Sequence, residues 1–257
     1  MLKLGIVGYG FVGKATEITL RKFYTPKFEV AIYDKKIIDS SIHSMKDCDY
    51  IFIALPTPPT LDGRCDTSII ESALVNLDVL QVKVPIIIRS TVVPRSTDLF
   101  RKQFPSLKIN FMPEFLTEAQ FWYDAENPYF IVIGGEEAEQ IKQDLFQEVT
   151  SIPVYCLTAV SAELLKYFLN TFFATKVIFS NQMFDIATGI NADYDEIWKI
   201  ATKHPFVGQN HFDVNFGGYR GYGGKCLPKD TKAIAYGFDN EFFQTIDRLN
   251  EELVSKK

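Results

Sequence analysis

The chain has 257 residues, of which 47% are hydrophobic and 23% are charged, and its formal net charge is −5. A chain of this length can bury one large core or two ordinary ones. The mild acidity argues against a nucleic-acid or anionic-membrane partner, because either would require a basic patch.

The sequence pattern contains no export signal or membrane span. No run approaches the roughly 18 uninterrupted apolar residues of a span, and the opening residues, MLKLGIVGYGF, lack a charged leader and a cleavage site. The four cysteines lie far apart with no CxxC pair, and the three histidines add no metal-ligand spacing. We therefore expect a cytoplasmic protein with reduced thiols, without a disulfide framework and without a metal.

The N-terminal part alternates short apolar segments with helix-like segments. The apolar segments are 2–7, 29–33, 49–55, 84–90, 107–111 and 129–135, and the candidate helices are 11–23, 67–80, 94–104 and 136–150. Continuous apolar strands separated by helices are typical of a parallel sheet covered on both faces. Ligands bind such sheets beyond the carboxyl ends of the strands, so the residues that follow each strand are the site candidates.

A glycine fingerprint, GYGFVG, follows the first strand and opens an amphipathic helix. Its glycines are Gly8, Gly10 and Gly13. Such glycines permit a tight turn and a close approach of the helix N-terminus to a pyrophosphate. Asp34 ends the second strand, where an acidic side chain can accept hydrogen bonds from the adenosine ribose and favours NAD over NADP. Lys35 and Lys36 leave a 2′-phosphate, and hence NADP, as the alternative.

Polar residues also follow the later strands. Pro56-Thr57 follows the third strand, Ser90-Thr91 the fourth, and Pro113 the fifth. A proline at this point predicts the start of a helix, in which Glu114 and Glu118 would share one face. A solvated helix face is the alternative interpretation of that pair.

Residues 158–189 predict one long helix without an internal proline, apolar nearly all round. Such a helix must be buried on most faces, either by a second subunit or by the rest of the chain. Lys166 and Asn170 lie on one face of it, and both are costly to bury unless paired or turned to a polar cavity. They suggest two donors for a developing oxyanion, with a small exposed window on the helix as the alternative.

Five motifs in order, GYGFVG, STVVP, PEFLTE, AELLKYFLN and GYGGKCLPKD, resemble those of the UDP-glucose/GDP-mannose dehydrogenase family from Leu4 to about Ile234. The resemblance implies an α/β fold in which a Rossmann-like NAD-binding domain, 1–157, has a doubly wound parallel sheet. A mainly helical domain with a long central helix, 158–257, follows it. Family members oxidise the primary alcohol of a nucleotide sugar to a carboxylate and reduce two NAD molecules. A homodimer formed through the central helix is also expected.

The resemblance also assigns roles to residues. Cys226 is the implied nucleophile, which captures the aldehyde as a thiohemiacetal that is then oxidised to a thioester. The other implied catalytic residues are Lys166 and Asn170 for the oxyanions, Asp230 for the hydrolytic water, and Thr91 and Glu118 for the alcohol oxidation. The implied cofactor contacts are Gly8, Gly10, Phe11, Val12, Gly13, Asp34, Pro56, Thr57, Thr91 and Glu118. The implied substrate contacts are Glu114, Phe115, Leu116, Lys166, Asn170, Arg220 and Gly223.

The chain departs from the family pattern at two points. The family continues into a third domain over the nucleotide half of the substrate, whereas this sequence stops at Lys257, so we expect a short form or a fragment without that domain. Phe206 stands where many members have an arginine that reaches the partner subunit's substrate, and Arg220 or His211 are the candidates to replace it.

Two other functions are compatible with parts of the pattern. A two-electron dehydrogenase of the hydroxyacid type would share the nucleotide domain and a central helix with a lysine, but its chemistry has no use for Cys226 and Asp230. A non-catalytic NAD-binding subunit would need none of the catalytic residues. The nucleotide-sugar dehydrogenase is therefore the leading hypothesis.

Overall fold

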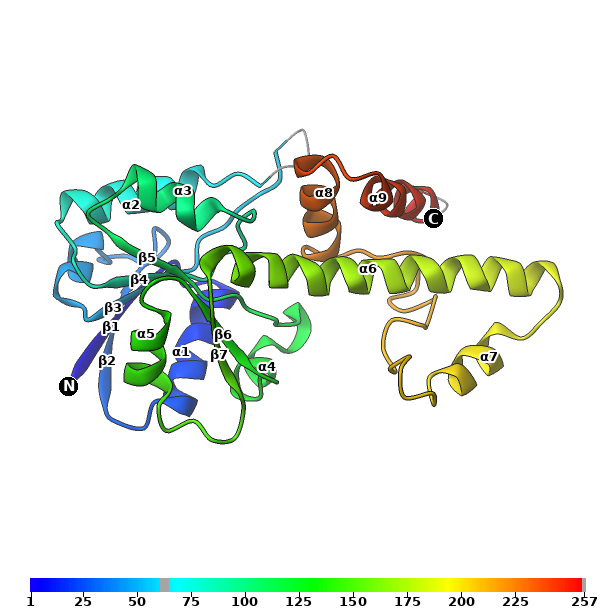
Figure 1. Cartoon of the computed structure of the whole chain (residues 1–257), viewed down its shortest axis with the longest axis horizontal. Helices are drawn as coiled ribbons and strands as arrows, with labels where there is room; N and C mark the ends of the chain where they lie inside the picture. Colours follow the sequence, from blue (N-terminus) through cyan, green and yellow to red (C-terminus); the bar gives the residue numbers. More distant parts are fainter. Residues whose placement is uncertain (61–64, 256–257) are drawn as a thin grey trace. The chain divides into compact units, whose positions relative to one another are not determined.

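The computed structural model describes residues 1–60 and 65–255 (Figure 1). The chain divides into two compact units. The first consists of Met1–Pro58 and Cys65–Lys166, and the second is built chiefly from the residues that follow Lys166. This division falls within the long helix α6 (Ala159–Gly189), whereas the domain boundary expected from the sequence, between 157 and 158, lies just before that helix. The expected division into domains stays a prediction.

The first unit contains a seven-stranded sheet in the order β2-β1-β3-β4-β5-β6-β7. Its strands are β1 (Leu2–Val7), β2 (Phe28–Tyr33), β3 (Tyr50–Ile53), β4 (Pro85–Ile88), β5 (Lys108–Phe111), β6 (Ile131–Gly134) and β7 (Val154–Leu157). All neighbouring strands are parallel except β5 and β6, which pair antiparallel at Phe111 and Gly134. The expected α/β class with a largely parallel sheet is therefore confirmed, with one antiparallel pair as a correction.

Helices cover both faces of this sheet. They are α1 (Phe11–Phe23), α2 (Ser68–Val79), α3 (Ser96–Gln103), α4 (Phe121–Glu126) and α5 (Ala138–Phe146), with short 3-10 turns at Ile42–Asp47 and Glu118–Gln120. Figure 1 shows α2 and α3 over one face and α1 and α5 over the other. Successive residues of β3 divide accordingly, because Ile51 and Ile53 pack in the core with α2, while Phe52 packs in the core with α1. This alternation explains why the strand is apolar throughout.

The strand order reverses at β1, because β2 lies on one side of β1 and β3 lies on the other. The segments that leave β1 and β3 therefore lead to opposite sides of the sheet from the carboxyl ends of these strands. In open α/β sheets this switch point is where ligands bind. The glycine fingerprint and the Pro56-Thr57 segment follow these two strands.

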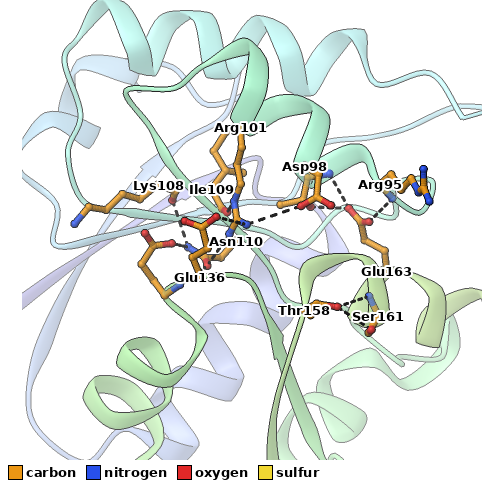
Figure 2. A network of polar contacts seen from close by, with 12 residues as sticks. Arg95, Asp98, Arg101, Lys108, Ile109, Asn110, Glu136, Thr158, Ser161 and Glu163 are labelled. Atoms are coloured by element: carbon orange, nitrogen blue, oxygen red, sulfur yellow. Dashed lines mark hydrogen bonds and ion pairs between the residues drawn. The ribbon is translucent and has the colours of Figure 1, made fainter.

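The second unit is helical. It contains most of α6, followed by α7 (Tyr194–Ala201), α8 (Leu227–Gly237) and α9 (Glu241–Val254). Thr158 begins α6 as its N-cap, since its hydroxyl oxygen accepts a hydrogen bond from the Ser161 amide at 3.2 Å (Figure 2). The long helix predicted over 158–189 is thus confirmed. Within the described residues, no helix combines the length and apolarity needed to cross a membrane.

Candidate functional site

The glycine fingerprint forms a tight turn between β1 and α1. A Cβ atom added to Gly13 would lie 2.1 Å from the Gly8 carbonyl oxygen, so α1 can approach the end of β1 only with glycine at 13. At Gly10, the N-cap of α1, an added Cβ would meet open space. The first turn of α1 carries no acidic side chain. These features fit a pyrophosphate approaching the helix N-terminus.

Asp34 lies beside this turn at the end of β2. Its carboxylate accepts hydrogen bonds from the Tyr9 amide at 2.7 Å and the Lys36 amide at 2.9 Å. The Lys36 and Tyr9 backbone bonds lower the pKa of Asp34 below its usual value, with a smaller contribution from the Lys36 charge. The ionised acceptor that a ribose requires is therefore held next to the glycine turn, and these residues fit an adenine dinucleotide.

The loops after β3 and β4 meet at the backbone of Thr91. The Thr91 carbonyl accepts a hydrogen bond from the Thr57 hydroxyl at 2.8 Å and one from the Cys65 thiol at 3.4 Å. The Ser90 hydroxyl accepts from the Leu55 amide, next to Pro56, at 2.8 Å. The structure thus brings together Thr57 and Thr91, both expected to contact the cofactor. Cys65 was not singled out from the sequence, because its partners lie on distant loops.

Glu163 fixes the far end of the loop that carries Thr91. It is fully buried in the first turns of α6, and it accepts hydrogen bonds from the Arg95 amide at 2.6 Å, the Thr97 amide at 2.8 Å and the Thr97 hydroxyl at 2.6 Å. Figure 2 shows its carboxylate directed at the start of α3. Arg95, the N-cap of α3, has a φ of 82° and no side-chain cap, so Glu163 supplies the capping acceptor from another helix.

Lys166 and Glu114 form a buried ion pair. The Lys166 ammonium lies 2.9 Å from Glu114 Oε1 and also donates to the Glu114 carbonyl, and the two side chains are 4% and 10% exposed. Burial acts to raise the pKa of Glu114, but the Lys166 charge, the Leu116 amide and the charge of Arg89 together hold it below its usual value. Because Lys166 is buried, the face of α6 that carries it is not an exposed window at this residue.

Arg89 is a further buried cation at this end of the sheet, 5% exposed. Its guanidinium donates to the Met112 carbonyl and the Thr16 hydroxyl, each at 3.2 Å, and to the Pro113 carbonyl at 3.4 Å. Burial lowers the pKa of Arg89 to about 10, which leaves it charged at neutral pH. Arg89 was not predicted as a site residue, although a lone arginine directly after an apolar strand is a signal that could have indicated it.

The helix expected after Pro113 does not form there. The Glu114 carboxylate accepts from the Leu116 amide at 2.8 Å, and Asp124 accepts from the Thr117 amide at 2.7 Å. These side chains take the backbone donors, so helical turns begin only at the 3-10 segment Glu118–Gln120. The prediction that Glu114 and Glu118 share one helix face is therefore wrong. The side chain of Glu118 lies outside what the structure describes.

Of the apolar residues on this unit that are expected to contact ligands, Phe11, Val12 and Phe115 make contacts with other residues of the unit. The Phe11 ring packs edge-on against Phe121, with centroids 5.3 Å apart, and is about half exposed. Val12 accepts a hydrogen bond from the Thr16 hydroxyl at its carbonyl. The Phe115 ring packs edge-on against Phe130 at 5.1 Å.

Cys226 lies in the second unit as the N-cap of α8, and its side chain is exposed. Its carbonyl accepts the first helical hydrogen bond from the Asp230 amide at 2.9 Å. The Asp230 carboxylate is 1% exposed; it accepts from the Asn170 side chain at 2.5 Å and lies 3.0 Å from the Lys229 ammonium. The structure thus brings Asp230, one turn after Cys226, together with Asn170 of α6.

Lys166 and Asn170 therefore have different partners. Lys166 pairs with Glu114 in the first unit, and Asn170 bonds to Asp230 in the second. Both side chains are buried and each has a polar partner. Such partners offset the free-energy cost of burying polar groups in an apolar helix. Their joint role at an oxyanion stays a prediction.

The segment before Cys226 is held by contacts within the second unit. Arg220 donates to the Asn181 side chain at 2.8 Å and pairs with Asp185 at 2.5 Å. His211 stacks on Phe173 with ring centroids 4.6 Å apart, while Phe206 is 92% exposed. A substrate contact by Arg220 or His211 stays a prediction.

The missing Cβ of Gly223 leaves room for a side chain of the protein itself. A Cβ added there would lie 2.1 Å from the Tyr219 hydroxyl oxygen.

All four cysteines are thiols in this structure. The part of the chain that the structure describes contains no group of three or more His, Cys, Asp or Glu side chains arranged to hold a metal ion.

Comparison with known proteins matches both parts of the chain to one family. Residues 36–150 match the NAD binding domain of the UDP-glucose/GDP-mannose dehydrogenase family, and residues 160–252 match its central domain. The chain is 29% identical to UDP-glucose 6-dehydrogenase of Streptococcus pneumoniae, over 92% of this chain and 69% of that protein. It is 27% identical to UDP-glucose 6-dehydrogenase YwqF of Bacillus subtilis, over 91% of this chain and 61% of that protein. For a further Bacillus subtilis relative, at 30% identity, the chain spans 49% of its length.

Solved structures share the fold. A UDP-glucose dehydrogenase from Pyrobaculum islandicum superposes with a TM-score of 0.85 at 24% identity, over 98% of this chain and 68% of that one. A 3-hydroxyisobutyrate dehydrogenase from Mycobacterium tuberculosis gives a TM-score of 0.75 at 14% identity, over 99% of this chain and 94% of that one. At these identities the likeness shows the fold alone.

The sheet, its glycine turn and the helical second unit define a protein of the dinucleotide-binding α/β class. Within that class, the chain belongs to the UDP-glucose/GDP-mannose dehydrogenase family, of which it contains the NAD-binding and central domains.

Proposed function

We propose that the chain is an NAD-dependent dehydrogenase that oxidises the primary alcohol of a nucleotide sugar to the uronic acid in two two-electron steps, as UDP-glucose 6-dehydrogenase does. The observation that supports this most is the group at the start of α8. Cys226 stands at the helix N-terminus, and the buried Asp230 follows one turn later in contact with Asn170. Such a group suits covalent capture of an aldehyde and hydrolysis of the resulting thioester.

In the first unit, we assign cofactor binding to the glycine turn and the neighbouring strand ends. The contacts are Gly8, Gly10, Phe11, Val12, Gly13, Asp34, Pro56, Thr57, Thr91 and Glu118. NAD bound there would supply the hydride acceptor for each oxidation. The N-terminus of α1 offers backbone N–H donors to the pyrophosphate, and the Asp34 carboxylate accepts from the ribose hydroxyls.

Replacement of Asp34 by alanine is expected to weaken NAD binding by about 10- to 100-fold, because hydrogen bonds to a charged group are lost. The affinity for NADP should change less, since Lys35 and Lys36 remain. Titration of NADH and NADPH fluorescence would measure both affinities, with the exposed Asp39→Ala variant as a control. Equal loss for both cofactors would contradict the assignment of Asp34 to the ribose.

Oxidation of the alcohol requires a base for the hydroxyl proton and a donor for the developing alkoxide. We assign the proton, directly or through a water, to Thr91 and Glu118, and the donor to Lys166. The contact with Glu114 keeps the Lys166 ammonium in one place. Glu114, Phe115 and Leu116 are the proposed substrate contacts of the same unit.

In the covalent step, the Cys226 thiolate attacks the aldehyde carbon, and the carbonyl electron pair moves to the oxygen, which takes a proton to give the thiohemiacetal. The N-terminus of α8 favours the thiolate. The Asn170 amide donates to the oxyanion of this adduct and of the later one. In the proposal, Arg220 and Gly223 contact the substrate.

After the second oxidation, water attacks the thioester carbon, the carbon–sulfur bond breaks, and the thiolate and the acid are released. Asp230 is proposed to accept a hydrogen bond from this water. Its Oδ1, although close to the Lys229 ammonium, accepts no hydrogen bond of good geometry from the residues described. Oδ1 is therefore the oxygen that we assign to this water.

Two other functions compete with this proposal. The fold likeness to the 3-hydroxyisobutyrate dehydrogenase fits a two-electron hydroxyacid enzyme equally well. That chemistry leaves Cys226 and the buried Asp230–Asn170 contact without a role. A non-catalytic NAD-binding subunit leaves the same groups unexplained, so the four-electron enzyme is favoured.

The proposal is tested by incubating the purified chain with NAD and a panel of UDP- and GDP-sugars, with product masses determined. A uronic acid would support the proposal and identify the substrate. Release of an aldehyde or ketone as the final product would support the two-electron alternative. NAD binding without turnover of any sugar in the panel would support the binding subunit.

We also propose a homodimer formed through α6. Along the part of α6 in the second unit, one side exposes large apolar residues: Phe168, Phe172, Phe179, Met183 and Ile186. Their spacing of three, four or seven residues forms a continuous stripe along the helix, and exposed apolar stripes mark association surfaces. Nothing in the net charge of −5 requires a nucleic-acid or membrane partner.

The double variant Phe172→Asp/Phe179→Asp is expected to convert the dimer to a monomer, because two carboxylates would have to be buried at the contact. Light scattering coupled to gel filtration would report the mass. Leu99→Asp, at an exposed apolar residue of α3, is the control. An unchanged mass for the double variant would rule out this stripe as the dimer contact.

A further inference from the structure

The segment that leads into Cys226 is anchored at Tyr222. The Tyr222 side chain is 4% exposed and packs in a core with Ala174 and Ile178 of α6 and Ile246 and Leu253 of α9. Only Gly223, Gly224 and Lys225 separate it from the N-cap of α8. The position of Tyr222 therefore limits where Cys226 can lie.

The side chain of Asn250 in α9 hydrogen-bonds to both the backbone N–H and the backbone C=O of Tyr222. The Tyr222 amide donates to Asn250 Oδ1 at 2.7 Å, and Asn250 Nδ2 donates to the Tyr222 carbonyl at 3.0 Å. Asn250 is 6% exposed. A primary amide is the side-chain group that can both accept from an N–H and donate to a C=O in this way, so the contact is specific to asparagine at this reach.

The neighbouring residue is adapted to the contact. Gly221 has a φ of +86°, a conformation that side chains rarely adopt, and a Cβ added there would lie 2.7 Å from Asn250 Oδ1. Glycine at 221 thus lets the amide reach the Tyr222 backbone. On the other side of the nucleophile, α8 is fixed by the Asp230 amide, which donates to the Cys226 carbonyl at 2.9 Å.

We propose that Asn250 is a positioning residue for Cys226, acting through the Tyr222 backbone. The amide fixes the segment ahead of the thiol, while the first turn of α8 fixes the segment behind it. If the contact is lost, two buried backbone groups lose their partners and Tyr222 shifts. The thiol then moves relative to the N-terminus of α8. The consequence for turnover rests on the proposed function, but the consequence for the thiol does not.

The test uses Asn250→Asp, which keeps an acceptor for the Tyr222 amide and loses the donor to its carbonyl, and Asn250→Leu, which loses both. Ile246→Ala is the matched control, because it removes a buried side chain of α9 from the same core and leaves the amide contact intact. Alkylation of Cys226 by iodoacetamide is followed by mass spectrometry across pH 5–9 in each folded variant. Cys156 serves as an internal reference thiol.

Both Asn250 variants are expected to change the rate of Cys226 alkylation relative to Cys156 by at least about threefold, or to shift its pH midpoint, with Asn250→Leu changing more. Ile246→Ala should leave the ratio unchanged. If Asn250→Leu does not fold, Asn250→Asp alone carries the test. An unchanged ratio and midpoint in a folded Asn250 variant would overturn the proposal, as would an equal change in Ile246→Ala.

Measurement of turnover separates this proposal from the proposed function. Asn250→Asp is expected to lower kcat for acid formation at least about tenfold with KM for the sugar little changed. If the wild-type chain forms no acid while the Asn250 variants alter Cys226 alkylation, the proposed function fails and the positioning role stands. If the wild-type chain forms acid and the alkylation is unaltered, the positioning role fails alone.

Discussion

Replacement of Cys226 by serine is expected to reduce acid formation by about 10³-fold or more, because removal of a covalent nucleophile typically costs this much. The serine hydroxyl is a far weaker nucleophile at neutral pH than a thiolate at a helix N-terminus. The first oxidation does not use the thiol, so the aldehyde should form and be released. NAD affinity should stay unchanged, since the cofactor residues lie in the first unit.

The measurement is NAD-dependent acid formation by mass spectrometry, together with trapping of the aldehyde by a hydrazine. Cys156→Ser is the control, because Cys156 is a partly buried thiol of β7 with no proposed role. Acid formation at the wild-type rate by Cys226→Ser would exclude the thioester mechanism. Loss of NAD binding in the same variant would show that the substitution had disturbed more than the nucleophile.

The second large effect is expected for Lys166→Met. This substitution leaves the buried Glu114 carboxylate without its nearest cation, and breaking a buried ion pair from one side costs about 3–5 kcal/mol. The double variant Lys166→Met/Glu114→Gln removes both charges and should recover most of the lost stability. Urea unfolding would measure the free energies, with the exposed Lys102→Met of α3 as the control, expected to lie within about 0.5 kcal/mol of wild type.

The loss of unfolding free energy in Lys166→Met should also depend on pH in a defined direction. In the wild type the pKa of Glu114 is lowered, so the stability it contributes is present at neutral pH and is lost as pH falls through the folded-state pKa. In Lys166→Met, burial acts with less opposition and raises the pKa of Glu114, so protonation relieves the penalty at higher pH. The difference in free energy of unfolding between wild type and Lys166→Met should therefore become smaller as pH falls from about 7 toward about 4. A difference that stayed constant over this interval would contradict the pairing.

Local patterns predicted most of the elements. Helix α1 has the predicted bounds, and α6 ends at the predicted residue and begins one residue inside the predicted segment, because apolar spacing and Thr158 as an N-cap are properties of neighbouring residues. The pattern did not predict β7, whose residues Val154–Leu157 are only partly buried or exposed and lack a continuous apolar signal. The pattern also did not predict the antiparallel pairing of β5 and β6, because strand direction in a sheet is not a local property.

In the candidate site, too, the local motifs could be predicted from the sequence and the long-range contacts could not. The fingerprint glycines, Asp34 and Cys226 stand in recognisable motifs, so the sequence could point to them. The partners could not be read in this way, because Lys166 and Glu114 lie 52 residues apart and Tyr222 and Asn250 lie 28 apart. The helix expected after Pro113 failed because the nearby side chains of Glu114 and Asp124 accept hydrogen bonds from its backbone donors.

The number of NADH molecules formed for each sugar consumed decides directly between a four-electron and a two-electron oxidation. The purified chain would be supplied with NAD and whichever UDP- or GDP-sugar of the panel it turns over, with NADH followed by absorbance and the product by mass. The proposed mechanism predicts two NADH for each sugar and a uronic acid as product. One NADH for each sugar, with an aldehyde or ketone as product, would contradict it.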